Sequence, residues 1–176
     1  MNEDTRIGLK VLSMCLQFPQ ESLGSELREA LAELSLPVLK DPCKAFAGYV
    51  AATPLLAVQE EYTKAFDLTP STSLNMSWHN CPDSRKRGAA LVNLKRLYRA
   101  AGWEPAMNEL PDYLPLMLEF MALGPDGASD LLRTQFANEV AVLAGRLSEA
   151  GSPYAGVLGA VAAAMETEQS GGRRHE

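Results

Sequence analysis

Apolar residues recur at helical spacing along nearly the whole chain, whereas alternating segments rich in Val, Ile and Thr are missing. Pro and Gly punctuate these periodic segments where helices are expected to begin and end. The pattern predicts helices over residues 4–18, 22–34, 55–66, 84–101, 112–123, 129–150 and 153–166, with a further short helix opened by Asp41 and Pro42. The predicted fold class is all-α, a single-domain bundle of about seven to eight helices.

The segment 112–123 is the most apolar of these helices. Asp112 is expected to be its N-cap, and Pro115 falls in the first turn, where a helix accepts proline at little cost. Almost no polar face remains, so this helix is predicted to be central and buried. Its apolar residues are Leu114, Leu116, Met117, Leu118, Phe120, Met121 and Leu123.

A long loop is expected after Asp67, because LTPSTSLNMSWHNCPD has no helical period and is dense in Ser, Thr, Asn and Pro. Loops of this length in compact domains are usually functional or mobile. The next helix has Asp83 or Ser84 as its expected N-cap, and Gly102 is expected to end it in the left-handed conformation. The long loop is therefore a candidate functional segment between two helices.

Composition and charge narrow the class of protein. With 47% hydrophobic and 22% charged residues, the 176-residue chain is suited to one soluble globular domain. We expect this domain to cover residues 1–166 and a disordered tail to cover residues 167–176. The net charge of −6 disfavours nucleic acid as a partner and favours a basic peptide.

Cysteine usage and the N-terminal sequence indicate a cytoplasmic protein. Cys15, Cys43 and Cys81 form no CxxC pair, and Cys15 and Cys43 are expected to be core residues. An odd number of cysteines in a chain that can form a core without disulfides fits a reducing compartment. The acidic N-terminus does not resemble a signal peptide, and no apolar run is long enough to span a bilayer, so no direct membrane insertion is expected.

His79 and Cys81 are the residues that most suggest chemistry. A zinc site would need two further ligands, and Cys15, Cys43 and His175 are not in paired spacing with them. A Cys81 nucleophile with His79 as its base would lack a recognisable orienting carboxylate or oxyanion hole. Phosphate-binding glycine motifs are also absent. Neither a cofactor nor a metal is therefore expected.

Three basic residues, Arg85, Lys86 and Arg87, fall in the first turn of the helix over residues 84–101. Cations are disfavoured there because they face the positive end of the helix dipole. Either this is simply a solvated turn, or Arg85 or Arg87 pairs with a carboxylate of a neighbouring segment. The candidates for that carboxylate are Asp67 and Asp112.

Three ordered segments stand out, namely EYTKAFDLTPSTSLN, SRKRGAALVNLKRLYRAAGW and ELPDYLPLMLEFMAL. These segments strongly resemble those of the nitrate reductase molybdenum cofactor assembly chaperones of the delta-subunit group, within the redox-enzyme maturation chaperones. They carry the motifs Y-x-x-x-F-D, followed by S-L, then S-R-x-R-G, and E-L-P-D-x-L-P. Tyr113 departs from the histidine of many members, and the region of Trp78, His79 and Cys81 matches no motif of the family.

The resemblance implies an all-helical cytoplasmic chaperone that is not an enzyme. Such a protein would bind the N-terminal segment of a molybdopterin-containing catalytic subunit, most simply that of respiratory nitrate reductase. It would assist molybdenum cofactor insertion and assembly before membrane attachment, and it would be a monomer or weak dimer. The expected peptide-binding residues are Tyr62, Phe66, Asp67, Leu74, Trp78, Arg85, Arg87, Pro111, Asp112, Tyr113 and Leu114.

Other interpretations stay open at this stage. Tyr62, Phe66 and Leu114 fit core packing as well as they fit an apolar groove for an amphipathic peptide. The client could be a related molybdoenzyme of the selenate, chlorate, dimethyl sulfide or ethylbenzene type, because groove residues report a peptide and not the client's chemistry. The alternative from another class is a small helical enzyme or metal-binding protein that uses His79 and Cys81.

Overall fold

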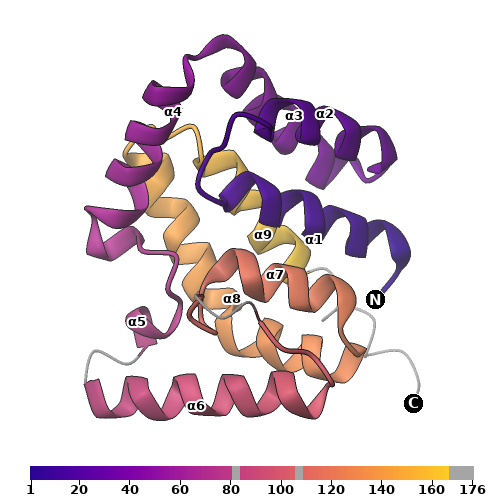
Figure 1. Ribbon diagram of the computed structural model, residues 1–176, viewed down its shortest axis with the longest axis vertical. Helices are drawn as coiled ribbons and strands as arrows, with labels where there is room; N and C mark the ends of the chain where they lie inside the picture. Colours follow the sequence, from indigo (N-terminus) through magenta and orange to yellow (C-terminus); the bar gives the residue numbers. More distant parts are fainter. Residues whose placement is uncertain (81–83, 106–108, 167–176) are drawn as a thin grey trace.

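The computed structural model describes residues 1–80, 84–105 and 109–166. Within these ranges it contains nine α-helices and no β-strand, so the predicted all-α class is confirmed (Figure 1). The helices are α1 (Glu3–Leu16), α2 (Leu23–Glu33), α3 (Pro37–Ala52), α4 (Leu55–Tyr62), α5 (Ser77–Asn80), α6 (Ser84–Ala100), α7 (Leu114–Leu123), α8 (Asp126–Glu149) and α9 (Ala155–Glu166). The predicted tail over residues 167–176 and the candidate cap Asp83 lie outside the described residues.

Helices α1, α7 and α9 form the centre of the bundle. Helix α1 packs against α7, α9, α2 and α3, and α9 also packs along α8 and α3. Figure 1 shows α2 and α3 at one end of the molecule and α6 along the opposite edge. Cys15 of α1 and Cys43 of α3 are fully buried, as expected for core residues. A hydrogen bond with the Cys43 thiol, together with burial, raises the pKa of the Cys15 thiol.

Helix α7 is as buried as its composition predicts. Eight of its ten residues are buried, and Pro115 sits in the first turn. Leu123 is the one residue of the predicted apolar set that is not buried, with 52% of its surface exposed. Among the described residues, no helix combines the length and apolar character needed to cross a bilayer. The apolar sequence of α7 therefore makes a core helix.

Asp112 is not the N-cap of α7, contrary to the sequence prediction. Tyr113 occupies the cap position in an extended conformation and makes no side-chain cap bond. The Asp112 carboxylate is instead turned toward the segment before α6, where it meets other polar groups. A tertiary contact has replaced the local capping bond, because burial makes each hydrogen bond to a carboxylate strongly favourable.

Helix α3 is the largest departure from the predicted helices. It runs from Pro37 to Ala52 instead of beginning at Asp41, and Pro42 lies inside it. Pro37 occupies the first turn, where a backbone N–H would have no partner within the helix, so the missing N–H of proline costs no hydrogen bond. The internal Pro42 removes one helical hydrogen bond, and the burial of Leu39, Cys43 and Phe46 on one face offsets that loss.

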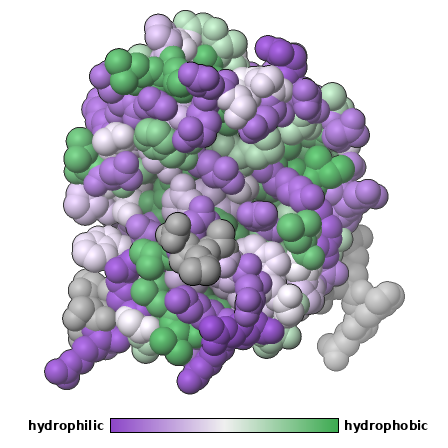
Figure 2. Space-filling view, viewed as in Figure 1, coloured by the Kyte–Doolittle hydropathy of each residue, from purple (hydrophilic) through white to green (hydrophobic). Residues whose placement is uncertain are grey.

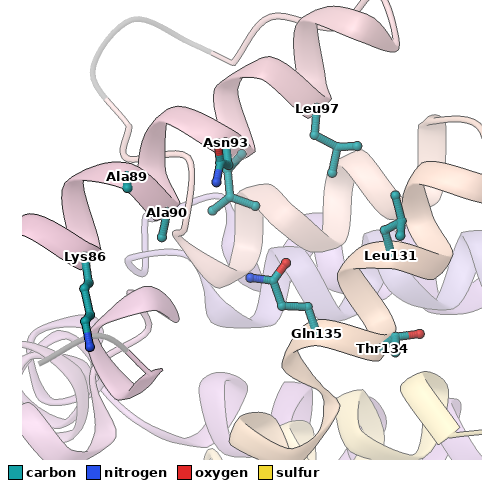
Figure 3. Close-up of a pocket in the computed structure, with 9 residues that line it drawn as sticks. Lys86, Ala89, Ala90, Asn93, Leu97, Leu131, Thr134 and Gln135 are labelled. Carbon is teal, nitrogen blue, oxygen red and sulfur yellow. The ribbon is translucent and has the colours of Figure 1, made fainter.

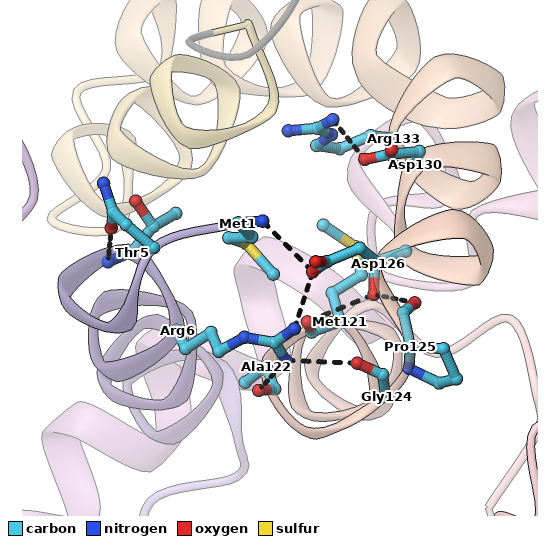
Figure 4. Close-up of polar contacts among 12 residues, drawn as sticks. Met1, Thr5, Arg6, Met121, Ala122, Gly124, Pro125, Asp126, Asp130 and Arg133 are labelled. Carbon is cyan, nitrogen blue, oxygen red and sulfur yellow. Dashed lines mark hydrogen bonds and ion pairs between the residues drawn. The ribbon is translucent and has the colours of Figure 1, made fainter.

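The corner between α7 and α8 is held by a residue from α1. The guanidinium of Arg6 donates to the carbonyls of Ala122 (2.7 Å) and Gly124 (3.1 Å), and it pairs with the Asp126 carboxylate at 2.6 Å (Figure 4). Helix α8 begins at Asp126, three residues before the predicted start at Ser129. Extended Pro125 ends the preceding turn, and an acidic residue in the first helical turn suits the helix dipole.

The predicted long loop is partly helical and is fastened to the bundle. It contains a 3₁₀ turn (Pro70–Thr72) and α5, which raises the helix count above the expected one. The stretch 74–76 pairs with residues 112–114 through Met76 N–H to the Asp112 carbonyl and Leu114 N–H to the Leu74 carbonyl, both at 2.8 Å. Since Leu74 and Met76 are buried, this segment belongs to the core and not to a free loop.

Asp112 joins this segment to α6. Its carboxylate is fully buried, and Oδ2 accepts hydrogen bonds from the Ser77 backbone N–H at 3.2 Å and from the Ser77 hydroxyl at 2.5 Å. The same oxygen lies 3.5 Å from Nη2 of Arg87, so the predicted pairing of Arg87 with Asp112 is confirmed. Arg87 Nε also donates to the Ser77 hydroxyl at 3.3 Å.

Replacing Asp112 by Ala is expected to lower the free energy of unfolding by about 3–5 kcal/mol, because it leaves a partly buried arginine without its carboxylate. Chemical denaturation followed by circular dichroism measures this change. Asp41→Ala is the matched control, since it makes the same change at an exposed aspartate of α3. The control should change stability by at most about 1 kcal/mol. Equal effects of the two substitutions would contradict the role given to Asp112.

Candidate functional site

A pocket of about 310 Å³ opens where the end of the α4 segment, the chain before α5 and the start of α6 come together. Four of the predicted peptide-binding residues line it, namely Phe66, Asp67, Trp78 and Arg87. Its remaining lining residues are Pro70, Ser73, Asn75 and Leu110. The volume lies at the lower end of the range for ligand sites, about 300–1,000 Å³, so it suits a few side chains of a peptide.

A π-helical turn places Phe66 in the wall of this pocket. Helix α4 continues into the turn Thr63–Asp67, in which the Leu68 N–H donates to the Thr63 carbonyl at 2.9 Å. The wider turn changes the direction of the side chains that follow it. The Phe66 ring packs with its centroid 5.0 Å from that of Tyr62 and 4.9 Å from that of Tyr154. Since Phe66 is only 3% exposed, this wall is a packed aromatic cluster.

Trp78 and Arg87 form the opposite wall. Cζ of Arg87 lies 5.3 Å from the ring centroid of Trp78, within cation–π range. Trp78 remains 49% exposed, whereas the Arg87 side chain is only 22% exposed because Asp112 and Ser77 hold its guanidinium. The pairing with Asp112 offsets the charge of Arg87, so Trp78 presents an accessible aromatic surface next to a largely neutralised cation.

Asp67 and Leu110 lie at the rim. Leu110 is 45% exposed, and Asp67 is also exposed. Partial loss of hydration raises the pKa of the Asp67 carboxyl above its ordinary value. An apolar side chain and an acidic side chain at the rim of an aromatic pocket match an amphipathic ligand that carries a positive charge.

Several of the predicted residues lie behind the pocket and not in it. The side chains of Tyr62, Leu74, Pro111, Asp112 and Leu114 are buried. Their contribution to peptide binding stays a prediction, and in this conformation they shape the site by supporting its walls. Arg85 is exposed at the start of α6 but does not line the pocket.

Tyr113 makes a specific polar contact with another tyrosine. Its hydroxyl lies 2.8 Å from the hydroxyl of Tyr62, and the Tyr62 hydroxyl also donates to the Leu16 carbonyl at 3.1 Å. Burial, followed by the neighbouring Tyr113, raises the pKa of Tyr62 far above its ordinary value. Both hydroxyls therefore stay neutral and tie the α4 segment to α1 and to the start of α7.

His79 has a structural partner, because its Nε2 lies 2.8 Å from the Ser73 carbonyl. Cys81 lies outside the described residues, and within the described part of the chain no group of three or more His, Cys, Asp and Glu could hold a metal ion. The bond to Ser73 orients the histidine ring along the segment that leads into α5. His79 therefore stabilises the conformation of the segment between Ser73 and α5.

Sequence reasoning missed four lining residues: Pro70, Ser73, Asn75 and Leu110. Ser73 and Leu110 fall inside the recognised motifs, so the motifs could have indicated them. Pro70 and Asn75 belong to the segment predicted as a loop. Their positions depend on the pairing of residues 74–76 with 112–114, which no short-range sequence pattern contains.

Comparison with known proteins finds relatives whose names refer to the assembly of nitrate reductase. The family model described as nitrate reductase delta subunit matches residues 20–159. A probable nitrate reductase molybdenum cofactor assembly chaperone of Bacillus subtilis, NarJ, is 32% identical over 166 residues, which cover 93% of this chain and 90% of that protein.

Two Escherichia coli relatives are longer than this chain. The probable chaperone NarW is 35% identical over 148 residues, which cover 83% of this chain and 62% of that protein. The chaperone NarJ is 33% identical over 156 residues, which cover 85% of this chain and 65% of that protein. Both names describe nitrate reductase molybdenum cofactor assembly chaperones. This chain therefore belongs to the nitrate reductase delta subunit family, which confirms the predicted resemblance to assembly chaperones rather than to enzymes.

Proposed function

We propose that this protein is a cytoplasmic chaperone that binds the N-terminal segment of the catalytic subunit of respiratory nitrate reductase. In this role it assists insertion of the molybdenum cofactor and assembly of that subunit before its attachment to the membrane. The names of the relatives support the assembly role. The molybdenum cofactor is bound by the client protein, and the role of this chain is to bind the client.

The observation that carries the proposal is the convergence of Phe66, Asp67, Trp78 and Arg87 on one pocket. Phe66 and Asp67 come from the first family motif, Arg87 comes from the second, and Trp78 lies between them. These segments are distant enough in sequence that only the fold brings them together. A shared pocket is the arrangement expected of motifs that recognise one ligand.

The pocket favours an amphipathic peptide with a basic end. Apolar side chains of the peptide contact exposed Trp78 and Leu110, with the buried ring of Phe66 behind them, and are removed from water there. Its basic residues face Asp67 and, beyond it, the acidic body of a chain with a net charge of −6. Such long-range attraction raises the rate of association more than it raises the affinity.

Trp78→Ala is expected to weaken binding of the client peptide by about tenfold or more, because exposed aromatic residues in pockets supply much of the binding free energy. The ligand is a synthetic peptide of the N-terminal segment of the nitrate reductase catalytic subunit from the same organism, and calorimetry measures the dissociation constant. The wild-type protein should bind it with a dissociation constant of about 1–10 μM or lower.

Leu68→Ala provides the control for this experiment, since Leu68 is 73% exposed and does not line the pocket. Its dissociation constant should change by no more than about twofold. Absence of binding by the wild-type protein at low salt would refute the proposal. Binding of only the corresponding peptide of a related molybdoenzyme would keep the chaperone role and reject nitrate reductase as the client.

Affinity for a basic client peptide is expected to fall as the pH is lowered, with Asp67 as the responsible group. The charged carboxylate attracts the peptide and the protonated form does not. Because its pKa is raised, Asp67 takes up its proton at a higher pH than an ordinary aspartate. Titration of peptide binding from neutral to acidic pH tests this. Asp67→Asn should bind more weakly at neutral pH and should lose this part of the pH dependence.

A further inference from the structure

Helix α6 concentrates positive charge in a chain whose net charge is negative. Its 17 residues include six Lys and Arg and no Asp or Glu, so the rest of the chain has ten basic residues against all 22 acidic ones. The six cations are Arg85, Lys86, Arg87, Lys95, Arg96 and Arg99. All of them except Arg87 are exposed. A helix of one charge sign on an acidic protein creates a local field that favours an anionic partner.

Polar contacts near both ends hold α6 to the bundle, and Leu94 packs into the core between them. Near its beginning, Arg87 pairs with buried Asp112. Near its end, the hydroxyl of fully buried Tyr98 donates to the Pro111 carbonyl at 2.7 Å, and the Tyr98 ring packs at a tilt with its centroid 4.6 Å from that of Phe120. Between these points α6 runs beside α8 without closing onto it, and a groove of about 650 Å³ remains.

The groove has an apolar interior and a single charged side chain. Figure 3 shows its labelled residues on α6 and α8 facing one another across the opening. It is lined by Lys86, Ala89, Ala90, Asn93, Leu94, Leu97, Leu131, Thr134 and Gln135. Leu131 is 61% exposed, and the neighbouring Val92 is 49% exposed. The uncovered leucine and the small alanines leave room for apolar side chains of a ligand.

We infer that the groove between α6 and α8 docks an acidic amphipathic helix of a partner protein. The apolar face of that helix contacts Leu97 and Leu131, and its acidic flank faces Lys86 and Arg96. Helices in grooves use apolar residues at every third or fourth position, which suits a groove that follows the length of α6. The basic peptide proposed for the Phe66–Trp78 pocket is not suited to this surface, because the cations of α6 repel it. The two sites therefore take ligands of opposite charge.

The geometry favours a helix over a membrane surface. Figure 2 shows hydrophilic side chains projecting along the edge of the molecule where α6 lies, with hydrophobic atoms beside them. Val92 is the large apolar residue on the outer face of α6, whereas the main apolar surface lies between two helices. A membrane-surface helix needs several large apolar residues on its outer face. A narrow ligand can reach the groove, and a flat bilayer cannot.

The test uses a fluorescein-labelled designed peptide that is helical, with leucines on one face and glutamates on both flanks, and a counterpart in which glutamine replaces every glutamate. Fluorescence anisotropy should show micromolar binding of the glutamate peptide at low salt, weakened by added salt, and much weaker binding of the glutamine peptide. Leu131→Ser should reduce the affinity about tenfold, because it removes exposed apolar contact area. Lys86→Glu should reduce it about fivefold.

Lys44→Glu on α3 is the matched control, because it makes the same charge change beside a different apolar hollow between α2 and α3. This variant should bind the glutamate peptide as the wild type does. An equal loss in Lys44→Glu, or no binding by the wild type, would overturn the inference. It would also be overturned if the protein bound phosphatidylglycerol vesicles instead of the peptide, or if the only effect of Leu131→Ser were to dissociate a dimer of this chain.

The Leu131→Ser variant should bind the client peptide as the wild type does. This measurement distinguishes a failure of the inferred α6–α8 docking site from a failure of the proposed function.

Discussion

The buried carboxylate of Asp112 is the interaction on which the arrangement of this molecule most depends. A fully buried charge is costly unless hydrogen bonds and an opposite charge compensate it, and here Ser77 and Arg87 supply both. Ser77 begins α5 and Arg87 lies in the first turns of α6, so the contacts of the single oxygen Oδ2 bring together α5, the start of α6 and the segment that leads into α7. Two of these parts supply Trp78 and Arg87 to the Phe66–Trp78 pocket, and the turn Thr63–Asp67 supplies Phe66 and Asp67.

This interaction also explains why α6 can differ so much in character from the rest of the bundle. Its outer face is cationic, Arg87 and Tyr98 make polar contacts near its two ends, and Leu94 packs into the core between them. The result is a molecule with two electrostatic environments. The acidic body suits a basic peptide, as proposed for the client, and the edge formed by α6 suits an acidic one. A chaperone of the nitrate reductase delta subunit family that holds a client during assembly benefits from surfaces that do not compete for the same ligand.

Much of the helical framework could be predicted from the sequence. The apolar character of the segment over residues 112–123 identified the central helix, and Gly102, with φ of 73°, ends α6 in the left-handed conformation as expected. The pairing of Arg87 with Asp112 was among the predicted alternatives, and the structure selects it. The failures share one cause. At Pro42, Asp112 and residues 74–76, contacts with distant segments outweighed local preference for a helix break, a cap and a free loop.

The sequence by itself determined the all-α class, the buried central helix and, through three ordered motifs, the family. These properties depend on periodicity and on residue types at short spacing, which a linear chain displays directly. Only the tertiary structure decided which motif residues reach a common pocket and which lie behind it. Tyr62 and Leu114 became buried support, and Phe66, which is equally buried, lies against the cavity that Asp67, Trp78 and Arg87 also line. The reason is that exposure is a property of packing between segments far apart in sequence, and neighbouring residues along the chain do not encode it.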